Sequence, residues 1–116
     1  MSRHSCEAAE AGGIDALIAD VGIEITLELA REYLAGVGRA LETIASGDMA
    51  ATRDVAHRLL GGARTLSLTT FARLWLSVEE LPSSQSKMPR ATVDELRRAC
   101  VELERWIERH HEQHCA

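Results

Sequence analysis

Residues Ala56–Leu68 read AHRLLGGARTLSL, a stretch with helical periodicity that also holds a histidine and two adjacent glycines. At roughly 100° per residue, its apolar residues gather on one face. That face predicts a core stripe made of Thr52, Val55, Ala56, Leu59, Ala63 and Leu66. His57 falls nearly opposite the stripe. The segment therefore predicts an amphipathic helix that displays an imidazole on its outer surface.

The residues that flank His57 on this outer face are basic or lack a side chain. Arg53 lies one turn before it, Gly61 one turn after it and Arg64 two turns after it. A glycine inside a helix costs about 1 kcal/mol relative to alanine, so two in succession suggest a purpose. An absent side chain at Gly61 would let another protein approach the imidazole closely. A helix end next to an ordinary surface histidine is the other interpretation of the same letters.

The segment resembles the signature of histidine phosphotransfer (HPt) domains of multistep two-component phosphorelays, A-H-x-L-K-G-[SA]-[SA]-x-x-[LI]-G. Here the signature reads AHRLLGGARTLS over residues 56–67. A second family pattern, L-x-x-x-[CA]-x-x-L-E, is similar in phase to Phe71, Trp75, Val78 and Glu79. Two departures from the signature matter: Leu60 replaces the usual lysine and Ser67 the usual glycine. The resemblance covers roughly residues 27–107.

The resemblance implies that His57 accepts a phosphoryl group from a receiver-domain aspartate of a hybrid sensor kinase and passes it to a response regulator. It implies Mg²⁺ on the partner receiver domain, no cofactor on this chain, and no kinase activity; whether a phosphotransfer intermediate counts as an enzyme stays open. Since the lysine is missing, we expect Arg64, and more weakly Arg53, to interact with phosphate. Leu60 and Gly61 are then expected partner contacts. The alternative is a docking module that binds a receiver domain or another enzyme without carrying phosphate.

Four amphipathic segments with short connections predict an all-α fold, an antiparallel up-down four-helix bundle with a short N-terminal capping helix. We expect helices over residues 23–45, 49–66, 71–81 and from 89–93 onward, and the capping helix over 13–21. We expect residues 1–12 to be a disordered leader or linker. Residues 13–116 are expected to form a single HPt-like bundle. The expected caps are Gly47, Asp48, Thr69 or Thr70, and Thr92. Close helix packing is the expected role of Gly36 and Gly38.

Composition favours an ordinary globular domain, with 46% hydrophobic and 27% charged residues. The few aromatic residues predict an aliphatic core. A net charge of −5, without a basic face, argues against nucleic acid. No apolar run suits a signal peptide or a membrane span, and three scattered cysteines form no disulfide framework. We therefore expect a cytoplasmic protein without direct membrane contact, either free-standing or the C-terminal module of a membrane-bound sensor kinase.

Other chemistries have little support in the sequence. Motifs for nucleotide binding, serine hydrolysis and zinc proteolysis are absent, and no carboxylate lies within helical reach of His57 to orient it as a base. His110, His111, His114 and Cys115 have a spacing that could bind a transition metal. A polar helix end with histidines near the negative end of the helix dipole explains them better, so we predict no metal site. Cys100 falls on a core position and is predicted to be unreactive.

Overall fold

The computed structural model describes residues 13–115, with the side chains of residues 13–113. A short helix over residues 13–21 is followed by α2 (Ile23–Ser46), α3 (Met49–Thr65), α4 (Thr69–Glu79) and α5 (Arg90–Cys115). The described residues contain no strand, so the all-α prediction is confirmed. The predicted leader, residues 1–12, lies outside the described residues. None of the described helices is both long and apolar enough to span a bilayer.

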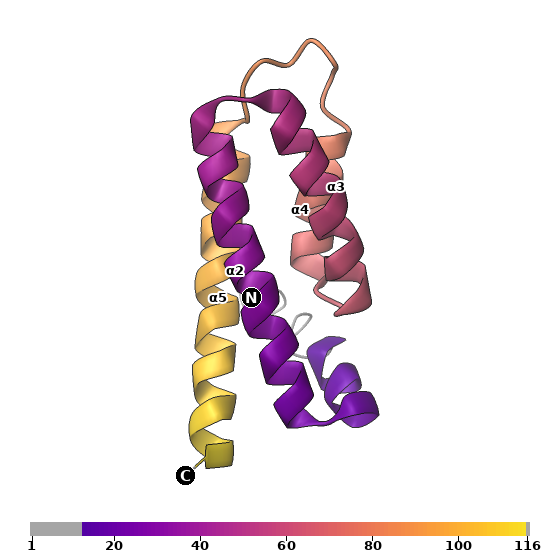
Figure 1. Ribbon diagram of the computed structural model, residues 1–116, viewed down its shortest axis with the longest axis vertical. Helices are drawn as coiled ribbons and strands as arrows, with labels where there is room; N and C mark the ends of the chain where they lie inside the picture. The colour runs from indigo at the N-terminus through magenta and orange to yellow at the C-terminus, as the bar shows by residue number, and fades with distance from the viewer. Residues whose placement is uncertain (1–12, 116) are drawn as a thin grey trace, which may run out of the picture.

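Helices α2 to α5 enclose one apolar core, each packing against the next in the chain while α5 also packs against α2. Figure 1 shows α2 beside α5 and α3 beside α4, with successive helices running in opposite directions. The short helix lies near the start of α2, at one end of the molecule. Its Ile14 is buried, which attaches this helix to the core.

The connection between α2 and α3 follows the predicted capping chemistry. Gly47 takes a left-handed conformation with φ of 82° and ends α2. Asp48 then caps α3, where its carboxylate accepts a hydrogen bond of 3.0 Å from the Ala51 N–H. The other caps differ from expectation: Leu68 holds the N-cap position of α4, and Thr92 lies inside α5.

The core includes every aromatic side chain of the chain, so the aliphatic prediction was incomplete: Tyr33, Phe71, Trp75 and Trp106 are all buried. Tyr33 and Phe71 meet edge to face, with ring centroids 5.3 Å apart. Trp75 Nε1 donates to the Tyr33 hydroxyl over 3.1 Å, and that hydroxyl donates to the Leu59 carbonyl over 2.8 Å. These hydrogen bonds fix α2 and α4 to α3 two residues beyond His57.

The aromatic cluster explains one of the two adjacent glycines of α3. A Cβ on Gly62 would lie 3.1 Å from Cε1 of Tyr33, whereas a Cβ on Gly61 would meet nothing within 4 Å. Because two hydrogen bonds hold the Tyr33 hydroxyl, its ring has little freedom to move. We expect Gly62→Ala to lower the free energy of unfolding by about 1 kcal/mol and Gly61→Ala to raise it by about 0.5–1 kcal/mol. Urea unfolding measures the sign of the change in each variant. A Gly62→Ala variant that is more stable than the parent would contradict the packing argument.

Ser67 ends α3 in a backbone conformation that favours glycine. Its φ is 59°, and the N–H of Leu68 bonds to the Ala63 carbonyl over 2.8 Å, as in a Schellman cap. A side chain in this region costs about 1 kcal/mol, so Ser67→Gly should raise the free energy of unfolding by roughly 0.5–1 kcal/mol. Thermal unfolding measures this gain. Ser83→Gly, in the exposed loop before α5, is the control and should give none; equal shifts in the two variants would refute the explanation.

Cys100 of α5 is half-buried, packed against the core. Burial, with a smaller effect of the Glu104 charge, raises the pKa of its thiol to about 11 from an ordinary 9.0. The thiolate is the reactive form of cysteine, so Cys100 is a poor nucleophile at neutral pH, as its predicted core position implied.

Candidate functional site

His57 lies on the outer face of α3, where 80% of its side chain is exposed. The helix buries Thr52, Ala56, Leu60 and Ala63 on its other side. The structure therefore places the imidazole as the periodicity predicted, in reach of another protein.

A carboxylate from the neighbouring helix orients this imidazole. His57 Nδ1 lies 2.6 Å from Oε1 of Glu79, in the last turn of α4. A carboxylate only accepts hydrogen bonds, so Nδ1 carries the proton in this contact. In the neutral ring Nε2 then holds the free lone pair. Helical periodicity could exclude only carboxylates of α3 itself, so this contact with Glu79 of α4 was not predicted.

Arg53 takes part in the structure in a way that its sequence position did not predict. Its Nη1 donates to the Leu81 carbonyl over 3.1 Å, and its Nη2 donates to the Pro82 carbonyl over 2.7 Å. These carbonyls follow the end of α4, so Arg53 ties α3 to the loop that leads to α5. Two of its nitrogens are thus engaged within the protein, which reduces its availability for phosphate.

Leu60 is buried, with only 4% of its surface exposed, and therefore cannot be the expected surface contact for a partner. The physical reason is the orientation of α3, which lies between α2 and α4. Leu59 falls toward Gly36 of α2 and stays partly exposed, while Leu60 turns into the core. A lysine at residue 60 would have to bury its ammonium group there or reach out past its neighbours.

Gly61 and Arg64 remain on the outer face beside His57. Gly61 has open space where a side chain would stand, and Arg64 is exposed in the last turn of α3. Arg64 falls on the same side of α3 as His57, two turns further along. The exposed surface on this side of α3 thus combines bare backbone at Gly61 with the guanidinium group of Arg64.

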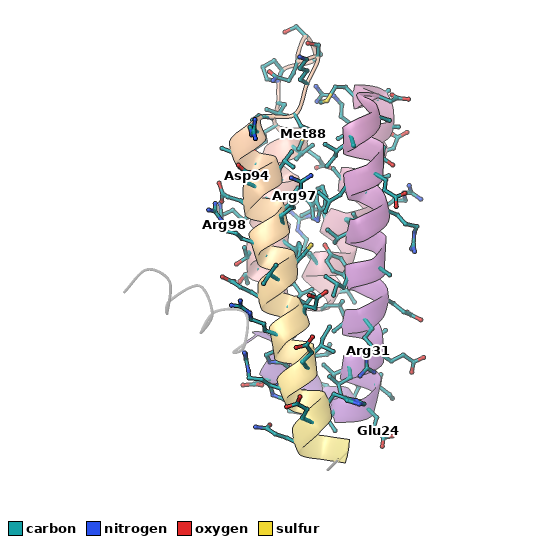
Figure 2. The ribbon with its side chains drawn as sticks, turned by 90° about the vertical axis from the view of Figure 1, so that its left-hand side faces the viewer. Glu24, Arg31, Met88, Asp94, Arg97 and Arg98 are labelled. Carbon is teal, nitrogen blue, oxygen red and sulfur yellow. The ribbon has the colours of Figure 1, made fainter. Side chains whose placement is uncertain are left out.

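The C-terminal histidines have partners within the protein. Figure 2 shows Arg31 on the part of α2 that borders α5, and its Nη2 lies 3.0 Å from His111 Nδ1. His110 stacks on Trp106, with centroids 4.1 Å apart, and its Nδ1 lies 3.0 Å from the Trp106 carbonyl oxygen. The side chains of His114 and Cys115 lie outside the described residues. Among the described side chains, no three His, Cys, Asp or Glu residues gather to hold a metal ion.

Comparison with known proteins adds one finding. The family model of the Hpt domain matches residues 22–106, a region that includes α2, α3, α4 and most of α5. No curated protein and no solved structure matches the chain.

Proposed function

This chain belongs to the Hpt domain family, and we propose that His57 is the residue through which it relays phosphate. The family implies histidine phosphotransfer in two-component signalling, with receiver domains as partners. One observation carries the assignment to His57: its imidazole is 80% exposed, yet its Nδ1 is held by Glu79. A surface histidine oriented in this way is ready for nucleophilic attack through Nε2.

In the proposed transfer, the Nε2 lone pair attacks the phosphorus of an aspartyl phosphate on the receiver domain. The Nε2–P bond forms as the bond from phosphorus to the aspartyl oxygen breaks, and the aspartate leaves as a carboxylate. The proton stays on Nδ1, where the Glu79 carboxylate balances the positive charge that develops on the ring. Reversal of these steps delivers phosphate to the next aspartate. Mg²⁺ belongs to the receiver domain, where it neutralises phosphoryl oxygens.

The partners in this proposal are receiver domains of a hybrid sensor kinase, of a response regulator, or of both, in the cytoplasm. We assign α2–α5 to the up-down four-helix bundle of the family, with residues 13–21 as its cap, a reading supported by the opposite directions of successive helices (Figure 1). The open backbone at Gly61 supports close approach by such a partner.

The proposal is tested by mixing the chain with phosphorylated receiver domains and analysing the phosphate that it acquires. Acid-labile, base-stable phosphate on a peptide that contains His57 is the expected result. A chain that binds receiver domains without acquiring phosphate would instead be a docking module, which is the second interpretation of the same resemblance.

Arg64 is the cation expected to assist transfer in place of the family lysine. Arg64→Ala should slow phosphotransfer severalfold and leave stability unchanged, because a single exposed charge contributes little. Arg53→Ala should mainly lower the free energy of unfolding, by about 1 kcal/mol, since it loses two hydrogen bonds to carbonyls. Transfer kinetics and urea unfolding of both variants, with Arg98→Ala on α5 as control, separate these roles. Unchanged transfer in Arg64→Ala would remove Arg64 from the site.

A further inference from the structure

Four large apolar side chains are exposed among the described residues: Val21, Ile25, Leu76 and Val101. The first two lie where the short helix meets α2, and Val101 belongs to α5. Leu76 differs from them in position, because it belongs to α4, the helix whose Glu79 holds the imidazole of His57. An apolar side chain, with 38% of its surface exposed, thus lies on the helix beside the reacting histidine.

Leu76 lies next to the bare backbone of Gly61. It precedes Glu79 by three residues in α4, and Gly61 follows His57 by four residues in α3. Because α3 and α4 run in opposite directions (Figure 1), these two steps lead the same way from the contact between His57 and Glu79. A Cβ on Gly61 would meet nothing within 4 Å, so the space over this glycine is open. Gly61 and Leu76 together form what we call the apolar patch beside His57.

The apolar patch is too close to His57 for a reacting protein to leave it uncovered. Leu76 lies about 4.5 Å along the helix axis from Glu79, whose Oε1 is 2.6 Å from the imidazole. Even a transient interface buries about 500–600 Å² on each partner, an area on the order of 25 Å across. An interface centred on His57 therefore extends over Gly61 and Leu76. Val101 lies on α5, which packs against α2 and α4.

We propose that the receiver domain places an aliphatic or aromatic side chain against Leu76, over the bare backbone of Gly61. This inference rests on the proposed function and names the contact that the partner makes beside the reacting groups. Covering an exposed leucine is favourable, and a central apolar anchor is a common source of affinity in protein interfaces. Gly61 weakens α3, and its own surroundings would accept a side chain. One apolar group of the partner accounts for both features.

The test compares Leu76→Gln with Val101→Gln, which make the same change at side chains of similar exposure, 38% and 43%. The probe is a purified receiver domain selected for phosphate transfer to the unsubstituted chain. We expect Leu76→Gln to weaken its binding at least about fivefold, measured by calorimetry, and Val101→Gln to change it less than about twofold. Leu76→Met keeps an apolar side chain and should bind within about twofold of the parent.

Gly61→Gln tests the same contact in a variant that folds at least as well as the parent, because it removes a helix glycine. Its side chain occupies the space proposed for the partner, so receiver binding should again weaken at least about fivefold. The double variant Gly61→Gln/Leu76→Gln should bind about as weakly as the weaker single variant, since both changes remove one contact. Losses that multiply in the double variant would mean two independent contacts and would contradict the proposal.

Phosphoramidate, a small phosphoryl donor that needs no docking surface, separates failure of this inference from failure of the proposed function. The parent, Leu76→Gln and Val101→Gln should acquire phosphate from it at equal rates. A parent chain that acquires none would refute the proposed function. Equal labelling with unchanged receiver binding in Leu76→Gln would overturn the inference alone. So would a loss of self-association in Leu76→Gln by sedimentation, which would make Leu76 a contact between copies of this chain.

Discussion

His57→Gln is expected to abolish phosphorylation of the chain while changing the free energy of unfolding by no more than about 0.5 kcal/mol. The side chain is 80% exposed, so its replacement leaves the bundle intact. Glutamine keeps a polar group near Glu79 but offers no nitrogen that can carry phosphate. Incubation with a phosphorylated receiver domain, followed by detection of acid-labile phosphate, measures the loss.

His111→Gln is the control for this experiment. It removes an exposed imidazole whose neighbour is Arg31, far along α5 from α3, and labelling should stay at the parent level. Labelling that persists in His57→Gln but disappears in His111→Gln would place the phosphate in the C-terminal tail. That result would overturn the assignment of the site.

The sequence predicts the parts of the site that depend on one helix. The cap at Asp48, the exposure of His57 and the open backbone at Gly61 all follow from local chemistry and helical periodicity, and the structure agrees. Leu59 and Leu60 mark the limit of this reasoning. They lie about 100° apart at opposite edges of the apolar stripe, so the packing of α3 against α2 and α4 decides which one is buried.

The sequence did not predict the side-chain contacts between helices. Glu79 lies 22 residues from His57, and the carbonyls that Arg53 binds lie 28 and 29 residues away. A helical wheel has no information on such distances. The second family pattern, which ends in the glutamate that corresponds to Glu79, held the available signal. It pointed to the residue without indicating that the carboxylate would meet the histidine.

Glu79→Gln is expected to slow phosphate transfer to His57 by about tenfold or more, the effect typical of losing a residue that orients a reactive histidine. In one orientation the neutral amide still accepts a hydrogen bond from Nδ1–H through its oxygen. It no longer balances the positive charge that develops on the ring. In the other orientation its NH₂ group faces Nδ1 and favours the proton on Nε2, which blocks attack. Both effects act on the phosphoryl-transfer step and not on docking. They should therefore lower the rate of phosphorylation with phosphoramidate, a small phosphoryl donor, as well as with a receiver domain.

Glu80→Gln is the matched control, since it makes the same charge change one residue away on an exposed side chain. If Glu79 acted only through the negative charge of the surface, both substitutions would slow phosphate transfer equally, and chiefly with the receiver domain as donor. A role in positioning His57 would slow Glu79→Gln alone, with either donor, while urea unfolding shows both variants close to the parent in stability. Equal rates in the two variants would mean that the 2.6 Å contact is an ordinary surface pair. In that case the exposure of His57, without its orientation, would be all that the fold contributes to transfer.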